Sequence, residues 1–241
     1  MSIEKPTAIV IDFDNTLYDY VSCNIKAQDV AAEMVSKELG VSKGQVVRSI
    51  ESSRTRVKNR LGSVASSHSR ILYLQEALVE MGFSSKPYVA LKYEQMYWSE
   101  FLIEMKPNPG AKDFLDSARF QKIPLVMVTD LTSQIQIRKL IYLGWELTFD
   151  YVVTSELVGS EKETGAPFDF ALNLLTETER KNVWFIGDQT FDVPDVNALK
   201  TSGVIVDGEG FLIGQRDASR EYISEFKDFF ELEARINLGS D

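Results

Sequence analysis

Five short apolar runs rich in branched side chains recur along the 241-residue chain, and polar or amphipathic segments separate them. They are Ala8–Ile11, Ile123–Val128, Tyr151–Val153, Val183–Ile186 and Val204–Val206. Their length and composition predict buried strands. Helical patterns follow three of the runs, at Gln134–Leu143, Phe168–Leu175 and Val196–Thr201. Strands that alternate with helices predict an α/β fold, with a parallel sheet covered by helices on both faces.

A long segment between the first two runs has no strand pattern. Its apolar residues recur at spacings of three and four, as they do on one face of a helix, and the clearest series is Ile71, Leu74, Leu78 and Met81. The sequence Lys106-Pro-Asn-Pro-Gly110 is the clearest linker and marks the return to the sheet. We therefore expect a core made of residues 1–17 and 105–241, with an inserted α-helical module at residues 18–104.

The composition limits the partners that the chain can have. A net charge of −10 argues against broad electrostatic binding to nucleic acid or to an anionic membrane. No apolar stretch is long enough to span a bilayer, the N-terminus lacks a signal-peptide pattern, and Cys23 is the single cysteine. We expect a cytoplasmic monomer or homodimer that binds neither nucleic acid nor membrane. The segment Glu221–Glu233 predicts an amphipathic helix with Phe226, Phe229 and Phe230 on or near its buried side.

Two aspartates directly follow the first apolar run, in Asp12-Phe13-Asp14-Asn15-Thr16. Parallel sheets bind ligands beyond the carboxyl ends of their strands, so both carboxylates are expected at the ligand-binding edge. An ordinary turn is the alternative, because Asp and Asn are common turn residues. The pattern Asp-x-Asp-x-Thr arises by chance in about 3% of chains of this length, which favours the functional interpretation.

Three later segments place further polar groups near strand ends. Thr129 and Asp130 end the second run, where a hydroxyl can donate to a phosphoryl oxygen or simply cap a helix. Lys162 lies in a polar loop before a helix, where it can neutralise phosphate charge or stay solvated. Gly187-Asp188 ends the fourth run. Asp12, Asp188 and a backbone carbonyl would form the hard-oxygen site that Mg²⁺ prefers.

In this order the motifs resemble those of the haloacid dehalogenase superfamily, which has a Rossmann-like core. Asp12 and Asp14 match its first motif, Thr129 the second, Lys162 the third and Asp188 the fourth. The helical insertion resembles the family's C1-type cap. The resemblance implies a Mg²⁺-dependent phosphatase that hydrolyses a phosphomonoester of a small polar metabolite through an aspartyl-phosphate.

The resemblance also implies a role for each matched residue. Asp12 is the nucleophile, Asp14 protonates the leaving oxygen and later deprotonates water, and Thr129 and Lys162 hold phosphoryl oxygens. Asp12, the Asp14 carbonyl and Asp188 bind the Mg²⁺. A divalent ion and a lysine would let an acidic protein bind an anion.

Three further aspects of the motifs concern specificity and the metal site. Because family members that cleave carbon–halogen or phosphonate bonds lack an aspartate at the Asp14 position, its presence favours P–O cleavage. Asn15 and Asp130 are candidates for substrate binding, although Asp130 stands where asparagine is commoner. Asp192 fits the form of the fourth motif, whereas Asp195 keeps the usual distance to a later glycine; we favour Asp192 as the additional residue of the metal site.

Substrate recognition is expected in the inserted module. Ser52–Gln75 contains five Lys or Arg residues and no Asp or Glu, with the only histidine of the chain. We expect Arg60, His68 and Arg70 to contact the non-reacting part of the substrate; a solvated basic helix face is the alternative. Two other functions share the motifs: a phosphomutase acting on a sugar phosphate, and a phosphate-binding regulator without catalysis.

Overall fold

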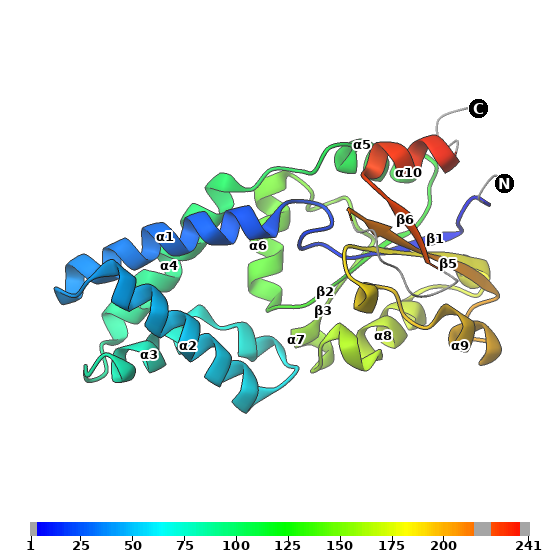
Figure 1. Ribbon diagram of the computed structural model, residues 1–241. Coiled ribbons are helices and arrows are strands. Elements are labelled where there is room, and N and C mark those ends of the chain that lie inside the picture. The colour runs from blue at the N-terminus through cyan, green and yellow to red at the C-terminus, as the bar shows by residue number, and fades with distance from the viewer. Residues whose placement is uncertain (1–3, 215–222, 237–241) are drawn as a thin grey trace. The chain divides into compact units, whose positions relative to one another are not determined.

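The computed structural model describes residues 4–214 and 223–236, which form two compact units (Figure 1). One unit comprises Met1–Asp19 and Lys106–Asp241, and the other comprises Tyr20–Met105. The strands of the first unit are β1 (Ala8–Ile11), β2 (Leu125–Thr129), β3 (Tyr151–Thr154), β4 (Asn182–Gly187), β5 (Asp207–Ile213) and β6 (Ile223–Phe226). Its α-helices are α5 (Ala111–Phe120), α6 (Ser133–Leu143), α7 (Ser155–Val158), α8 (Ala166–Leu174), α9 (Val196–Thr201) and α10 (Phe229–Ile236).

Within the described residues the strands form one six-stranded sheet in the order β3-β2-β1-β4-β5-β6, and every neighbouring pair is parallel. β1 lies between β2 and β4, with Ile11 opposite both Met127 and Ile186. Helix α8 packs on one face through Phe168 and Leu172. On the other face α5 packs against α10, as Figure 1 shows. The predicted Rossmann-like α/β fold is confirmed.

The predicted fifth strand is wrong. Val204–Val206 precedes the strand, which is β5, and Val206 is 72% exposed. The Asp-Gly-Glu-Gly start of β5 resembles a turn, but Gly208 is needed there because a Cβ would lie 2.7 Å from the Val183 carbonyl oxygen. Because a glycine is needed at this position, the start of β5 lacks the apolar run from which a strand is predicted.

The predicted C-terminal helix is wrong in its first half. Residues 221 and 222 lie outside the described residues, and Ile223–Phe226 is the edge strand β6. Helix α10 begins at Phe229. Phe226 and Phe229 are buried as expected, whereas Phe230 is half exposed.

The second unit consists of four α-helices in its described residues: α1 (Tyr20–Leu39), α2 (Lys43–Leu61), α3 (Arg70–Glu80) and α4 (Pro87–Glu104). α1 packs on α4 and α2 packs on α3. Ser42 and Ser69 begin α2 and α3 as N-caps, because each hydroxyl accepts a backbone N–H of the first turn. Among the helices of residues 4–214 and 223–236, none is long and apolar enough to cross a membrane.

Candidate active site

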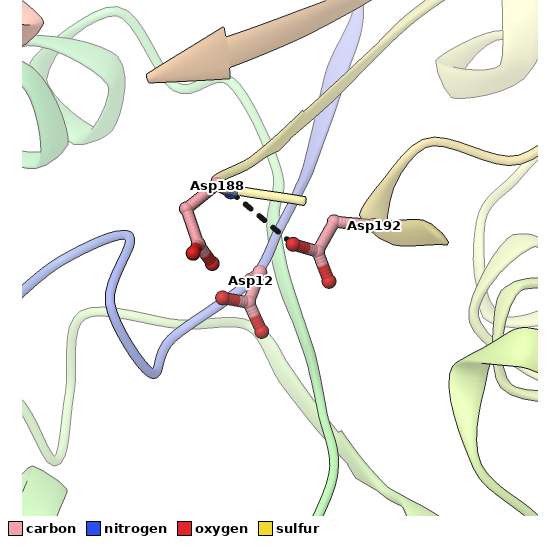
Figure 2. A group of neighbouring side chains, drawn as sticks. All are labelled: Asp12, Asp188 and Asp192. Carbon is pink, nitrogen blue, oxygen red and sulfur yellow. Dashed lines mark hydrogen bonds between the residues drawn. The ribbon is translucent and has the colours of Figure 1, made fainter. Parts of the chain in front are cut away.

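The carboxyl ends of β1 and β4 place two aspartates side by side. The Asp12 backbone N–H donates to the Ile186 carbonyl at 2.8 Å, so the ladder between the two strands continues into the site. Asp188 follows β4 directly. Carboxylate oxygens of Asp12, Asp188 and Asp192 lie within 4.8 Å of one another, and Figure 2 shows the three side chains converging. Thr16, which is fully buried, donates its hydroxyl to Asp12 Oδ2 at 2.8 Å.

Asp192, rather than Asp195, joins this group. Asp192 is buried and accepts the backbone N–H groups of Asp188 and Gln189 at 3.2 and 2.8 Å. Gly187 allows this turn, because a Cβ on it would lie 2.6 Å from Asp192 Oδ2. Asp195 is exposed and caps α9 by accepting from the Ala198 N–H.

Lys162 brings a positive charge to the cluster of Asp12, Asp188 and Asp192. It lies in the 3₁₀ turn Lys162–Thr164, its side chain is buried, and its ammonium donates to Asp12 Oδ1 at 2.5 Å and to Asp192 Oδ1. Asp130 accepts the Lys162 backbone N–H at 3.1 Å. The carboxylate of Asp130 therefore holds the loop that carries Lys162. This hydrogen bond gives Asp130 a structural role that involves no substrate.

Burial makes negative charge on the three clustered aspartates unfavourable. Desolvation, together with repulsion from Asp192, raises the pKa of Asp12 to about 7 despite its contact with Lys162. Desolvation and the charge of Asp12 raise the pKa of Asp188 to about 6. Burial also raises the pKa of Asp192. Although burial alone would lower the pKa of Lys162, Asp12 and Asp192 raise it well above its usual value. One ammonium thus faces three carboxylates.

A second lysine binds Asp14, and the sequence analysis missed it. Lys139 on α6 donates to both carboxylate oxygens of Asp14, at 2.8 and 3.0 Å. Tyr18 donates its hydroxyl to Asp14 Oδ1, and Gln136 Nε2 lies 3.3 Å from Oδ2. The only local signal was the presence of Gln136 and Lys139 three positions apart, on the helix that follows the Thr129 strand.

The remaining predicted residues of the sheet edge have backbone and side-chain partners. Thr129 is buried, and its hydroxyl oxygen accepts a hydrogen bond from Gln136 Nε2 at 2.5 Å. Asn15 has a φ of +69°, a left-handed conformation that asparagine tolerates better than most residues. Its carbonyl, like that of Thr16, accepts from Asn108 Nδ2. The turn after β1 is thereby fastened to the linker that precedes α5.

Arg60, His68 and Arg70 lie in the helical unit, and their part in substrate binding stays a prediction. Arg60 is exposed and forms an ion pair with Glu76. The Arg70 guanidinium is buried, donates to the His68 carbonyl at 2.7 Å and to the hydroxyl groups of Tyr20 and Tyr97, and packs over aromatic rings. Arg70 therefore has a structural role in its own unit.

A family model described as haloacid dehalogenase-like hydrolase matches residues 9–205. The chain belongs to this family. A ribulose-1,5-bisphosphate 5-phosphatase from Halopiger xanaduensis is 34% identical to it over 203 residues, which cover 83% of this chain and 84% of that protein. The predicted family and the predicted enzyme class, a phosphatase of the haloacid dehalogenase type, are confirmed.

Solved structures of family members share the fold. The hydrolase YfnB from Bacillus subtilis, bound to magnesium, aligns with a TM-score of 0.69 and 16% identity over 98% of this chain and 100% of that one. A 2-haloacid dehalogenase from Pseudomonas syringae aligns with a TM-score of 0.70 and 16% identity over the same shares. Because the fold is common to phosphatases and dehalogenases, only the side chains of the site distinguish the reactions.

Proposed function

We propose that this haloacid dehalogenase-type phosphatase is a Mg²⁺-dependent phosphomonoester hydrolase that forms an aspartyl-phosphate on Asp12. The observation that carries the proposal is the buried Asp12 carboxylate at the carboxyl end of β1, contacted by Lys162 and next to Asp188. A carboxylate that is held by hydrogen bonds and shielded from water is suited to attack phosphorus in line.

The chain's own residues account for the two half-reactions. Asp12 would attack phosphorus while the bond to the leaving oxygen breaks, and Asp14 would give that oxygen its proton. Asp14 would then take a proton from water as the water attacks the aspartyl-phosphate and releases phosphate. Thr129 lies at the end of β2, and Lys162 lies in a loop at the same edge of the sheet. Both would hold phosphoryl oxygens.

The donor set fits a hard divalent cation. The raised pKa values of Asp12 and Asp188 reflect buried negative charge that one lysine does not balance. Asp12 and Asp188, with the Asp14 carbonyl, would hold Mg²⁺, and Asp192 would support them by holding Lys162 and the Gly187–Gln189 turn. When bound, Mg²⁺ would neutralise carboxylate charge so that an anionic substrate can approach.

The first substrates to test are phosphorylated sugars. The relative that is 34% identical acts, by its name, on the 5-phosphate of ribulose 1,5-bisphosphate. A small polar phosphorylated metabolite of this class is the substrate that we propose, with the helical unit as a C1-type cap that selects it.

Release of phosphate tests the proposal. Wild-type protein with Mg²⁺ should release inorganic phosphate from ribulose 1,5-bisphosphate or from another member of a panel of sugar phosphates, nucleotides and phosphorylated acids, and EDTA should abolish the release. Asp12→Asn should lower kcat by at least about 10⁴-fold on every substrate, because no nucleophile remains. Asp113→Asn, which changes an exposed aspartate of α5, is the matched control. Activity retained in Asp12→Asn would refute the assignment, and transfer of phosphate to a second hydroxyl of the sugar would identify a mutase.

A further inference from the structure

Lys139 is a buried lysine whose ammonium is directed at one carboxylate. Its side chain is fully buried, whereas that of Asp14 remains 21% exposed. The rings of Phe13 and Tyr18 flank the ammonium, with centroids 5.8 and 5.5 Å away. A lysine that is removed from water in this way is strongly destabilising unless it is paired, so its position is tied to that of Asp14.

Three donors leave the Asp14 carboxylate little rotational freedom. Lys139 contacts both oxygens, Tyr18 donates to Oδ1, and Gln136 approaches Oδ2. Since a carboxylate accepts hydrogen bonds at both oxygens, these donors hold both oxygens of Asp14 in place. A carboxylate held in this way has a fixed direction from which to take a proton from water in the second half-reaction.

Gln136 connects this carboxylate to the adjacent strand end. Its Nε2 lies 2.5 Å from Thr129 Oγ1 and 2.8 Å from the Asp130 carbonyl, in addition to its approach to Asp14. Its Oε1 is buried and has no hydrogen-bond partner among the described residues. Leaving a buried acceptor unsatisfied is destabilising, so stability alone does not explain this glutamine.

We propose that Lys139, assisted by Tyr18 and Gln136, is the positioning residue that holds Asp14 as the base for hydrolysis of the aspartyl-phosphate. The inference rests on the proposed function. Lys139 itself exchanges no proton with substrate. It fixes the carboxylate in the orientation in which Asp14 accepts the proton of the attacking water, while the water oxygen bonds to phosphorus and the bond from phosphorus to Asp12 breaks.

Rapid-quench kinetics of Lys139→Met with p-nitrophenyl phosphate and Mg²⁺ tests this role. The leaving p-nitrophenolate does not need a proton, so phosphorylation of Asp12 should keep its wild-type rate. Hydrolysis of the aspartyl-phosphate should slow by about 10²-fold. The expected result is a burst of close to one p-nitrophenolate per enzyme, slow steady-state turnover, and accumulated phosphoenzyme. Equal slowing of both steps, or no slowing, would overturn the proposal.

Two further variants separate positioning from folding. Tyr18→Phe removes only a hydroxyl and should slow the same step to a smaller extent. Lys139→Met in an Asp14→Asn background should add no further slowing, because the lysine would act only through Asp14; additive losses would contradict this. Lys112→Met, at an exposed lysine paired with Asp116, is the control and should behave as wild type.

The wild-type measurement distinguishes the two possible failures. If wild-type protein with Mg²⁺ releases no phosphate from any substrate, the proposed function fails. If the wild type turns over, Asp12→Asn is inactive, and Lys139→Met has wild-type kinetics of both steps, only the role of Lys139 fails.

Discussion

Asp188 illustrates how a single residue can be unfavourable for folding and still suit a metal site. Its pKa lies near 6 because it is buried beside Asp12, against an ordinary value of 3.8. Between these two pH values the folded protein keeps a proton that the unfolded chain has released. Stability therefore falls as the pH rises from about 4 to about 6, and the full penalty, on the order of 1–3 kcal/mol, remains at higher pH.

Asp188→Asn should remove this penalty. In EDTA at pH 8 the variant should be more stable than the wild type. The difference should shrink as the pH falls toward 4 and vanish only well below 3.8, where both states of the wild type hold the proton. Urea denaturation at pH 8, 6 and 4 measures the effect. Added Mg²⁺ should stabilise the wild type more than the variant. A variant that is no more stable than the wild type at pH 8 in EDTA would show that the buried charge is compensated in some other way.

At the scale of elements, the turn after β4 depends on one glycine. Gly187 lies so close to Asp192 that any side chain would displace the 3₁₀ turn Thr190–Asp192. The displaced turn would withdraw the carboxylate that holds Lys162 and the N–H groups of Asp188 and Gln189.

Gly187→Ala should therefore reduce both stability and activity. We expect a loss of about 1–3 kcal/mol in the free energy of unfolding and at least a tenfold lower kcat, measured by denaturation and by phosphate release. Gly44→Ala is a suitable control, because a Cβ there would meet only the flexible end of Arg48 at 3.3 Å. Wild-type activity in Gly187→Ala would mean that the position of Asp192 is unimportant.

At the scale of the whole molecule, the two compact units should respond separately to mutation. Arg70 is part of the interior of Tyr20–Met105, where its guanidinium contacts Tyr20 and Tyr97 and packs 4.6 Å from the Tyr97 ring centroid. Truncation would leave a cavity and buried hydroxyl groups without their donor.

Arg70→Ala should destabilise the helical unit by about 2–4 kcal/mol. Hydrogen exchange should accelerate in Tyr20–Met105 and stay unchanged in β1, β2 and β4. Arg60→Ala should change little, because its pair with Glu76 is exposed. Equal acceleration in both units would show that they unfold together. For Arg70, a raised KM is evidence of substrate contact only if the helical unit remains folded.

The sequence by itself determined the parallel sheet, the places of the four strands β1 to β4, and the aspartates that follow β1 and β4, whereas β6 was predicted as part of a helix. Apolar runs show burial directly, and a carboxylate at the end of such a run must lie near the ends of the neighbouring strands. For that reason the sequence alone is enough to place Asp12 and Asp188 together. The start of β5 was missed because close backbone contact requires a glycine at position 208, and the Asp-Gly-Glu-Gly sequence there resembles a turn.

Only the tertiary structure decided which charges meet. Lys139 reaches Asp14 across a separation of 125 residues, and Asp192 rather than Asp195 turns toward Lys162. Such contacts depend on the register of strands that are distant in sequence and on the rotation of α6 about its axis. A local pattern records only what a residue's own neighbours along the chain require, so it does not encode these contacts.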